Sequence, residues 1–491
     1  MSPWVGEVSA LTIEALQTHG VFYAGVPEQA CLRIKVEAQE GEKLSKVVCN
    51  TGRSGKGCIG AAYLYRSDFP FFSTHAKEAA CAVKVCKSSA ASGQMVFKLN
   101  NAAKLKAGAN YFWLVYDVSA AAKGGEKVCG ELVSATDGAG TEVTPAKKKN
   151  GAFRADGKPA VSPGEVFPFK YRIAPYVRPK WACVNNKAMF TEAHLKNMTD
   201  FIVFGFSHKG PHLTGAADAV DGKGTDYTQQ CMELARELRG KSKTRILAGF
   251  SCKETHNPLS AVMHDEGKRH ILVQELAALV LEQGYEGIDI DWEYPRESGR
   301  FKPFASWRKF AVFLAELRGA LAGTGASISI AVTTRYDAPN AEVLDGADFI
   351  NSMSYGRPGE HSTKAAASED VDFLIKRRIP KVKVVLGLPF FSRDTKPKHQ
   401  DQGGMGYAAI LKALPGLAPS RNVFNHPQTG EQHFFNGPDL IKDKCKTFVL
   451  QQGCGGVCIW AYDTDVPMSN PKSLSKALYS VIKQKKISAD R

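Results

Sequence analysis

Three carboxylate side chains occupy alternate positions in the stretch Gly287–Glu293, which reads GIDIDWE. Successive side chains of an extended strand point to opposite faces, so Asp289, Asp291 and Glu293 share one face and the apolar residues share the other. Like charges held this close cannot all remain ionised, and at least one carboxyl group takes a raised pKa. A carboxyl group that stays protonated near neutral pH is suited to general acid catalysis. The pattern therefore predicts acid–base chemistry at the end of a strand.

The same acids could instead bind a cation, because carboxylates are usual ligands of Mg²⁺. The strict alternation that ends on Glu293, at the tip of a predicted strand, favours the acid–base interpretation. Cys454 and Cys458 are four residues apart near another predicted strand, but no paired CxxC sets with zinc spacing occur. We therefore expect these cysteines to be buried thiols, and we expect neither a metal nor another cofactor.

The elements that would position the acids lie after Lys170, where apolar strands alternate with helical patterns. The predicted strands are 172–177, 201–206, 245–250, 287–292, 327–332, 349–353, 382–388 and 456–460. Between them lie stretches such as Arg269–Leu281, with apolar residues at the three- and four-residue spacing of an amphipathic helix. Eight such alternations fit a closed parallel barrel, in which active residues gather at the C-terminal ends of the strands. The expected fold class is α/β, a (β/α)8 TIM barrel.

The first part of the chain follows a different pattern. From Val21 to Val143, short runs such as Cys31–Glu37 alternate polar and apolar residues, which is typical of antiparallel strands with one buried face. Residues 144–167 are rich in Pro, Gly, Lys and Ser without periodicity, as a linker is. We therefore predict an all-β, sandwich-like accessory domain at 1–150, a linker at 151–168 and a catalytic barrel at 169–485.

Charge and composition bear on several classes of function. The formal net charge is +15, but basic runs occur only at Lys147–Lys149 and Lys483–Lys486, and no nucleic-acid-binding signature accompanies them. No apolar run is long enough to span a membrane. Six cysteines precede residue 150, so disulfides could staple the first domain in an oxidising compartment. We expect no nucleic-acid partner, no membrane span and a monomer.

The acidic stretch, continued through Tyr294 and Pro295, closely resembles the D-G-x-D-x-D-W-E-Y-P signature of glycoside hydrolase family 18, which contains chitinases and endo-β-N-acetylglucosaminidases. The resemblance covers residues 170–480 and includes three further motifs in family order. They are Met353-Ser354-Tyr355, Leu386–Phe391 and Gly455–Trp460. In the first domain, Ala109–Val118 resembles a strand of the N-terminal module that precedes some bacterial sialidases and other secreted glycosidases.

The resemblance implies a reaction in which the substrate supplies the nucleophile. Glu293 would protonate the glycosidic oxygen while the carbonyl oxygen of the 2-acetamido group attacks the anomeric carbon, giving an oxazolinium-like intermediate. Asp291 would orient the acetamido group, with Asp289 sharing protons behind it. Tyr355 would donate a hydrogen bond to the attacking oxygen. These four residues are the implied catalytic set.

The resemblance also implies a sugar-binding site. Trp460 would form a platform under the distorted sugar and Met353 a pocket wall, with Tyr294 and Phe206 as further substrate-binding candidates. The implied activity is retaining hydrolysis of β-1,4-linked N-acetylglucosamine, as in chitin or chitooligosaccharides. An endo-β-N-acetylglucosaminidase acting on N-glycan cores and a catalytically silent chitin- or glycan-binding lectin are the alternatives. A carbohydrate partner of this kind favours a secreted, periplasmic or cell-surface protein, whose trimmed form would lack a signal peptide.

Several positions depart from the family pattern. Gly356 follows the M-x-Y motif where the family usually carries Asp, and Glu286 replaces the first Asp of the signature. The third strand reads Ala248-Gly249-Phe250-Ser251 instead of S-x-G-G, and the first strand has Pro175 near a frequent Tyr. We therefore expect two groups that usually hydrogen-bond Asp289 to be missing.

Overall fold

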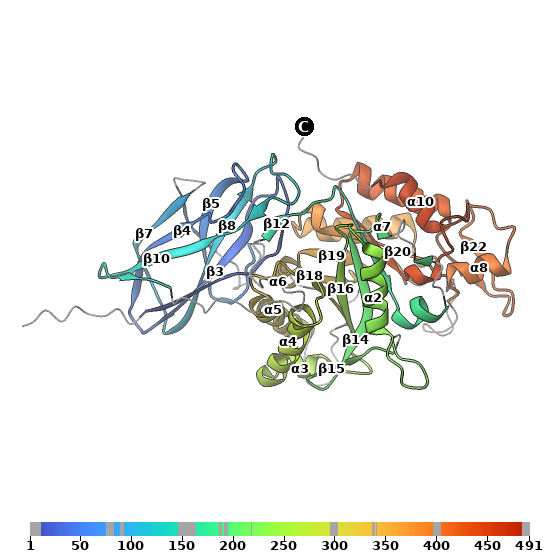
Figure 1. The fold of residues 1–491 in the computed structure, drawn as a ribbon, viewed down its shortest axis with the longest axis horizontal. Helices are drawn as coiled ribbons and strands as arrows, with labels where there is room; N and C mark the ends of the chain where they lie inside the picture. The colour runs from blue at the N-terminus through green and yellow to red at the C-terminus, as the bar shows by residue number, and fades with distance from the viewer. Residues whose placement is uncertain are drawn as a thin grey trace, which may run out of the picture.

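The computed structural model describes residues 11–74, 83–88, 93–145, 164–185, 189–190, 195–217, 219–294, 303–335, 339, 341–395 and 404–483. Within these ranges a β-sandwich comes first in the chain and a closed barrel with surrounding helices follows (Figure 1). This arrangement confirms the predicted fold class. Most of the expected linker, 151–168, lies outside the described residues, so the domain boundaries stay predictions. No helix in the described ranges is long and apolar enough to cross a bilayer.

Eight parallel strands close the barrel. They are β13 (Arg172–Val177), β14 (Asp200–Lys209), β16 (Arg245–Lys253), β17 (Gly287–Glu293), β18 (Ser327–Val332), β19 (Phe349–Ser352), β20 (Val384–Pro389) and β24 (Gly456–Trp460). Because β13 pairs with both β14 and β24, the sheet closes on itself. A further strand, β15 (His212–Gly215), extends β14 as an antiparallel hairpin. The barrel strands are buried along most of their length, since side chains fill the interior and helices cover the outside.

Helices pack around the outside of the barrel (Figure 1). Those described are a π-helix η1 (Trp181–Asn185), α2 (Thr228–Arg239), α3 (Ser260–Met263), α4 (Glu266–Leu281), α5 (Pro303–Ala320), α6 (Ala341–Gly346), α7 (Lys364–Lys376), α8 (Tyr407–Ala413), α9 (Pro438–Lys444) and α10 (Leu474–Val481). Asp265, Thr363 and Ser473 each accept a hydrogen bond from the first turn of α4, α7 and α10. Such caps satisfy a backbone N–H group that has no partner within the helix, and so they fix where each helix begins.

Short elements connect the later strands. Three short turns of helix are η3 (Lys381–Lys383), η4 (Cys445–Gln451) and η5 (Tyr462–Thr464). Beyond β20, the strands β21 (Arg393–Asp394), β22 (Val423–Asn425) and β23 (Gln432–Phe434) form a small antiparallel sheet. This sheet places Arg393 just past the C-terminal end of a barrel strand.

Two antiparallel sheets form the sandwich. One has the order β1 (Thr12–Gln17), β3 (Gln29–Ala38), β8 (Gly108–Val118), β5 (Ile59–Ser67), β6 (Val83–Lys87), and the other has the order β11 (Glu142–Val143), β10 (Glu131–Asp137), β4 (Lys43–Asn50), β7 (Gln94–Lys104). Period-two alternation sends Ile34, Phe97 and Phe112 into one shared core.

The disulfides considered for the first domain do not occur in its described part. Cys31, Cys49, Cys58, Cys86 and Cys129 are free thiols there. Cys81 lies outside the described residues. Burial of the apolar faces of the two sheets therefore accounts for the packing of the sandwich.

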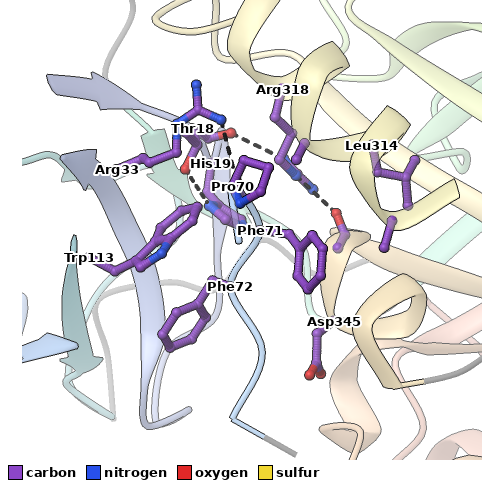
Figure 2. A pocket seen from close by; sticks show the side chains of 13 residues that line it. Thr18, His19, Arg33, Pro70, Phe71, Phe72, Trp113, Leu314, Arg318 and Asp345 are labelled. Atoms are coloured by element: carbon purple, nitrogen blue, oxygen red, sulfur yellow. Dashed lines mark hydrogen bonds between the residues drawn. The ribbon is translucent and has the colours of Figure 1, made fainter. Parts of the chain in front are cut away.

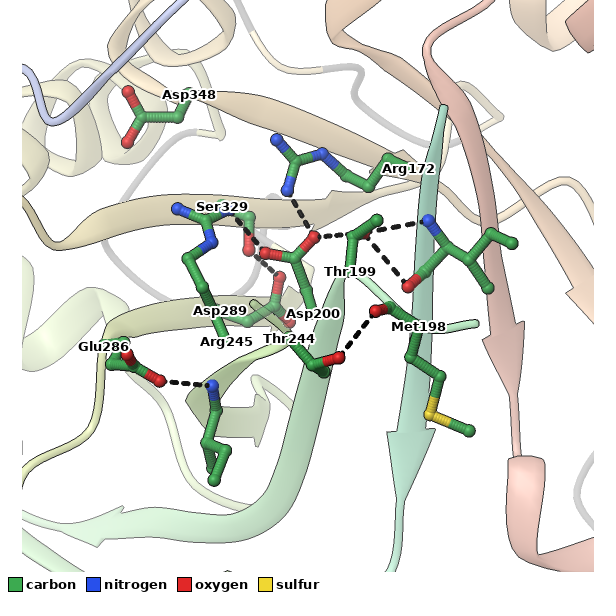
Figure 3. A network of polar contacts seen from close by, with 12 residues as sticks. Arg172, Met198, Thr199, Asp200, Thr244, Arg245, Glu286, Asp289, Ser329 and Asp348 are labelled. Carbon is green, nitrogen blue, oxygen red and sulfur yellow. Dashed lines mark hydrogen bonds and ion pairs between the residues drawn. The ribbon is translucent and has the colours of Figure 1, made fainter. Parts of the chain in front are cut away.

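A buried charge network occupies the end of the barrel where the strands begin (Figure 3). Arg172, Asp200 and Arg245 are the first residues of β13, β14 and β16, and both guanidinium groups pair with the Asp200 carboxylate. The Arg172 guanidinium also lies 4.1 and 3.7 Å from the ring centroids of Phe167 and Phe349. Pairing and stacking compensate these charges for their loss of water. The network lies at the opposite end of the strands from the predicted site.

The first domain covers this end of the barrel. Its small sheet of β2 (Val21–Phe22), β12 (Gly164–Val166) and β9 (Lys127–Val128) leads directly into Tyr23. The Tyr23 hydroxyl accepts a hydrogen bond from Arg172 Nη2 at 3.2 Å and donates one to the carbonyl oxygen of Asp348 at 2.9 Å. A sandwich residue thus supplies one of the hydrogen bonds of a buried arginine of the barrel.

A second contact between the two domains involves α5. Arg318 pairs with Asp348 and donates a hydrogen bond to the carbonyl oxygen of Thr18 at 3.3 Å. Beside it, a small pocket lies between the domains, with Trp113 and Phe72 on the sandwich side (Figure 2). The two domains therefore share polar as well as apolar contacts.

Candidate active site

The acidic row of β17 lies inside the barrel, toward the end where the strands finish. In the register of the sheet, Asp289 lies opposite Gly249 of β16 and Ser329 of β18, and Asp291 lies one layer higher. Asp289 is 0% exposed and Asp291 5% exposed, whereas Glu293 at the strand tip is half-buried. The structure therefore places the three predicted acids in a row that runs from the interior to the rim.

Hydrogen bonds from neighbouring strands hold Asp289. Its Oδ1 accepts from Ser329 Oγ at 2.5 Å (Figure 3) and from Asn351 Nδ2 at 3.0 Å. Asn351 Nδ2 also donates to the Tyr176 hydroxyl at 2.8 Å. Burial raises the pKa of Asp289 to about 6, although bonds from these three side chains stabilise the ionised form and oppose the rise.

Two oxygen atoms of this row have no hydrogen-bond partner among the described residues. They are Asp289 Oδ2 and Asp291 Oδ1, and both are buried. Burial, followed by the charges of Glu293 and Asp289, raises the pKa of Asp291 well above its usual value, and Lys253 opposes this only in part. Buried carboxyl groups in such a row share protons, because neighbouring ionised ones destabilise each other. The geometry therefore suits proton transfer along the row.

Aromatic side chains surround the acids in one cluster of the barrel interior. Tyr294, Tyr355 and Trp460 pack against a buried set that includes Met353 and Phe204. Trp460, the last residue of β24, meets the Phe204 ring with the centroids 4.7 Å apart and the planes at 72°. Since Trp460 is only half-buried, part of its ring stays open at the rim.

Tyr355 lies just after β19, among the charges of the acidic row. Burial of its hydroxyl, together with nearby Cys458, Asp291 and Glu293, raises the pKa of Tyr355 well above its usual value. The phenol is therefore neutral at ordinary pH and able to donate a hydrogen bond. A Cβ atom on Gly387 of β20 would lie 2.9 Å from Tyr355 Cε1, so the absence of a side chain there makes room for the ring.

Phe206 lies outside this cluster, unlike the other predicted substrate-binding residues. It packs in the core between barrel and helices, with its ring 5.7 Å from that of Tyr285. An irregularity in the register of β14 between Phe204 and Phe206 breaks the alternation of faces. The prediction that Phe206 contacts substrate therefore does not fit its position, and Phe204 occupies the interior in its place.

Of the two partners of Asp289 that were expected to be missing, the serine of the third strand is absent and the tyrosine is present. The tyrosine is Tyr176, which shares the interior face of β13 with Ala174 and hydrogen-bonds Asp289. Gly249 of β16 offers no side chain, but Ser329 supplies a hydroxyl from β18 on the other side. Alternation in the predicted first strand could have identified Tyr176. The role of Ser329 depends on strand register, for which the local sequence carries no signal.

The described ranges contain no group of three His, Cys, Asp or Glu side chains placed to hold a metal ion. Cys454 and Cys458 are buried, and burial raises the pKa of Cys454 to about 11 and that of Cys458 well above its usual value. Protonated thiols are poor metal ligands, so the geometry agrees with their reading as core residues.

The part of the chain that resembles known proteins is the barrel. The model of glycosyl hydrolases family 18 matches residues 172–465. Chitotriosidase-1 of Mus musculus is 21% identical over 322 residues, which cover 55% of this chain and 68% of that protein. Probable chitinase 2 of Drosophila melanogaster is 25% identical over 259 residues, which cover 41% of this chain and only 51% of that protein.

Solved structures share the fold. A chitinase from Bacteroides thetaiotaomicron has a TM-score of 0.52 at 22% identity, covering 64% of this chain and 97% of that one. The group IV chitinase of Ostrinia furnacalis has a TM-score of 0.51 at 16% identity, covering 63% of this chain and 99% of that one. Because the family model spans more than half of the chain and contains the whole acidic row, the protein belongs to family 18 of the glycosyl hydrolases, as a chitinase-like glycoside hydrolase.

Proposed function

We propose that the protein is a retaining glycosidase that hydrolyses β-1,4-linked N-acetylglucosamine, as in chitin or chitooligosaccharides, with the substrate's own acetamido group as nucleophile. One observation carries the proposal. The row Asp289, Asp291 and Glu293 rises from the barrel interior to its rim, where Tyr355 and Trp460 belong to the same interior cluster. An acid, a proton-sharing anion, a neutral hydroxyl donor and an aromatic platform are the groups that this reaction requires.

In the first step Glu293 gives its proton to the glycosidic oxygen, and the bond from that oxygen to the anomeric carbon breaks. The acetamido carbonyl oxygen forms a bond to the same carbon from the opposite face, which yields an oxazolinium ion. Asp291 accepts a hydrogen bond from the acetamido N–H and stabilises the positive charge that develops there. Tyr355 donates a hydrogen bond to the attacking oxygen and holds it in line.

In the second step a water molecule attacks the anomeric carbon while Glu293 takes a proton from it. The bond from the carbonyl oxygen to that carbon breaks, the acetamido group is restored, and the configuration at the anomeric carbon is retained. Asp289 supports both steps from below. Its pKa of about 6 lets it share a proton with Asp291 as the charge on the acetamido group rises and falls.

The decisive experiment is turnover of a fluorogenic N,N′-diacetylchitobioside by the wild type and by Glu293→Gln. The substitution keeps the size of the side chain but removes the acid, so we expect the rate to fall at least about a hundredfold with an unchanged fold. NMR of the first product should show the retained anomer. A near-normal rate in Glu293→Gln, or an inverted product, would overturn the mechanism.

The same assay addresses the two alternatives. A wild-type protein that binds chitooligosaccharides without releasing the fluorophore would be a lectin. Product analysis on chitin oligomers and on a high-mannose glycopeptide, run side by side, distinguishes a chitinase from an endo-β-N-acetylglucosaminidase. We expect cleavage of the chitin oligomers.

A further inference from the structure

Two arginine side chains converge on Gly356, the residue directly after Tyr355. A Cβ atom on Gly356 would lie 3.4 Å from Arg335 Nη2 and 3.5 Å from Arg393 Nη1. The two arginines follow the C-terminal ends of β18 and β20, so they lie on the same rim of the barrel as the acidic row. Gly356 has a φ of 77°, a conformation that favours glycine, and its lack of a side chain leaves the space between the guanidinium groups empty of the side chains that the structure describes.

Arg335 contacts Tyr355 directly, and Arg393 lies against a ring that packs on Tyr355. Arg335 Nη2 donates a hydrogen bond to the carbonyl oxygen of Tyr355 at 2.6 Å, and its Nε donates one to Thr333 Oγ1 at 3.2 Å. The Arg393 guanidinium lies 5.7 Å from the ring centroid of Phe391, and that ring meets the Tyr355 ring at 5.9 Å. Both arginines are half-buried, so solvent screens their charges less than it screens surface charges.

The surroundings of Arg393 differ from those of a neighbouring arginine. No ion pair of Arg393 occurs within the described ranges, whereas the nearby Arg357 pairs with Glu369 and Asp370. His361, whose Nδ1 accepts a hydrogen bond from Gly356 N at 3.2 Å, has a pKa lowered to about 3 by burial and then by Arg393 and Lys444. The imidazole is therefore neutral, and Arg393 brings a positive charge to the rim beside Tyr355.

We infer that Arg335 and Arg393 form a subsite for an anionic group on the glycan, a carboxylate or a sulfate carried by a sugar next to the N-acetyl sugar at Tyr355. This inference rests on the proposed function. Guanidinium groups bind planar carboxylates and sulfate-type oxyanions through paired, charge-assisted hydrogen bonds. An acidic side chain at position 356 would occupy the same space, and glycine leaves it to the substrate. The net charge of +15 favours the approach of such a glycan.

Binding to the Glu293→Gln protein tests the inference apart from catalysis. Calorimetry at low salt would compare chitotetraose with its 6-O-sulfated form and with an oligosaccharide that bears lactyl carboxylates on alternate sugars. We expect at least one anionic ligand to bind about tenfold tighter than the neutral one, and the ratio to fall as salt is added. The sulfated and carboxylated arms show which anion the site takes. Equal affinities for all three ligands would overturn the inference.

Two matched variants in the same background supply the control. Asp and Asn have nearly the same shape and both tolerate a positive φ, so Gly356→Asp and Gly356→Asn differ mainly in charge. We expect Gly356→Asp to abolish the preference for the anionic ligand and Gly356→Asn to weaken it far less. Should neither variant fold, Arg393→Gln is expected to remove most of the preference. The subsite would be contradicted if Gly356→Asp and Gly356→Asn showed the same preference for the anionic ligand. It would also be contradicted if Arg393→Gln kept the preference of the Glu293→Gln protein.

The outcomes for the two proposals are separate. If the wild type hydrolyses the neutral chitobioside but shows no anion preference, the proposed function stands and the subsite is wrong. If the wild type hydrolyses nothing but the Glu293→Gln protein prefers the anionic ligand, the subsite stands as part of a glycan-binding protein.

Discussion

Ser329 Oγ donates a 2.5 Å hydrogen bond to Asp289 Oδ1 from β18, the neighbour of β17 on the side away from Gly249. The family pattern carries its serine on the third strand, which is β16 here. In this protein the hydroxyl that stabilises Asp289 comes from β18, on the other side of β17. A closed barrel permits this exchange, because each strand has a neighbour on both sides at the same height. The requirement is for a donor at that position, whichever strand supplies it.

Ser329→Ala should slow the reaction and shift its pH profile. Ser329 stabilises the ionised form of Asp289, so its removal raises the pKa of Asp289 further and moves the rising limb of the kcat profile to higher pH. A hydrogen bond to a charged group contributes about 1.5 to 3 kcal/mol, so we expect a loss in kcat of about tenfold or more. The control is Ser352→Ala, because Ser352 Oγ is buried against Ser354 instead. An unshifted profile in Ser329→Ala would contradict a positioning role.

Stability should fall as pH rises between about 4 and about 6. Asp289 has a pKa near 3.8 in the unfolded chain and about 6 when folded, so the folded state binds the proton more tightly. The stability that protonated Asp289 contributes is fully present below about pH 4 and is lost as the pH rises through about 6. At about 1.4 kcal/mol per pKa unit, the loss is about 3 kcal/mol. Asp289→Asn cannot titrate and should lose less stability over this window. Urea unfolding at pH 4 and pH 7 gives the free energy of unfolding of both proteins. An equal change in that free energy between the two pH values for wild type and Asp289→Asn would refute the assignment.

The strands and the acidic row were predictable because their signals are local. Alternation over seven residues is enough to place Asp289, Asp291 and Glu293 on one face. Phe206 shows the limit of that reasoning, since one irregular residue in β14 exchanges the faces beyond it. The partnership of Ser329 with Asp289 joins residues 40 positions apart and depends on barrel register. Contacts of that kind follow from packing of the whole fold.

The two phenylalanines of β14 should therefore respond differently to truncation. Phe204→Ala removes the ring against which Trp460 packs, so we expect KM for chitooligosaccharides to rise several-fold. Phe206→Ala leaves a cavity beside Tyr285, which should cost about 3 to 5 kcal/mol of stability while KM of the folded protein stays normal. Steady-state kinetics and denaturant unfolding of both variants measure the difference. A raised KM in Phe206→Ala alone would restore that residue to the site.

Because the two domains contact each other, a loss of activity on deleting the first domain would have two explanations. Tyr23 hydrogen-bonds Arg172, and Thr18 hydrogen-bonds Arg318, from the side of the barrel opposite the acidic row. Removing the sandwich would uncover the buried charge network at the floor of the barrel, the end where the strands begin, and leave both arginines short of a partner. Loss of activity in such a deletion would therefore follow from instability as readily as from loss of a binding module. A single-atom change separates the two effects.

Tyr23→Phe removes only the hydroxyl that joins Arg172 to the carbonyl oxygen of Asp348. Both groups are buried, and leaving them without this partner should lower the free energy of unfolding by about 1 to 3 kcal/mol. Because Arg172 begins β13 and the acids end β17, kcat and KM at a temperature well below melting should stay within about twofold of wild type. Tyr63→Phe is the matched control, since its hydroxyl bonds Asp117 within the sandwich at 2.8 Å. Equal stability of the two variants would show that the Tyr23 bridge does not hold the domains together, whereas a loss of kcat in Tyr23→Phe alone would mean that the floor of the barrel is coupled to its rim.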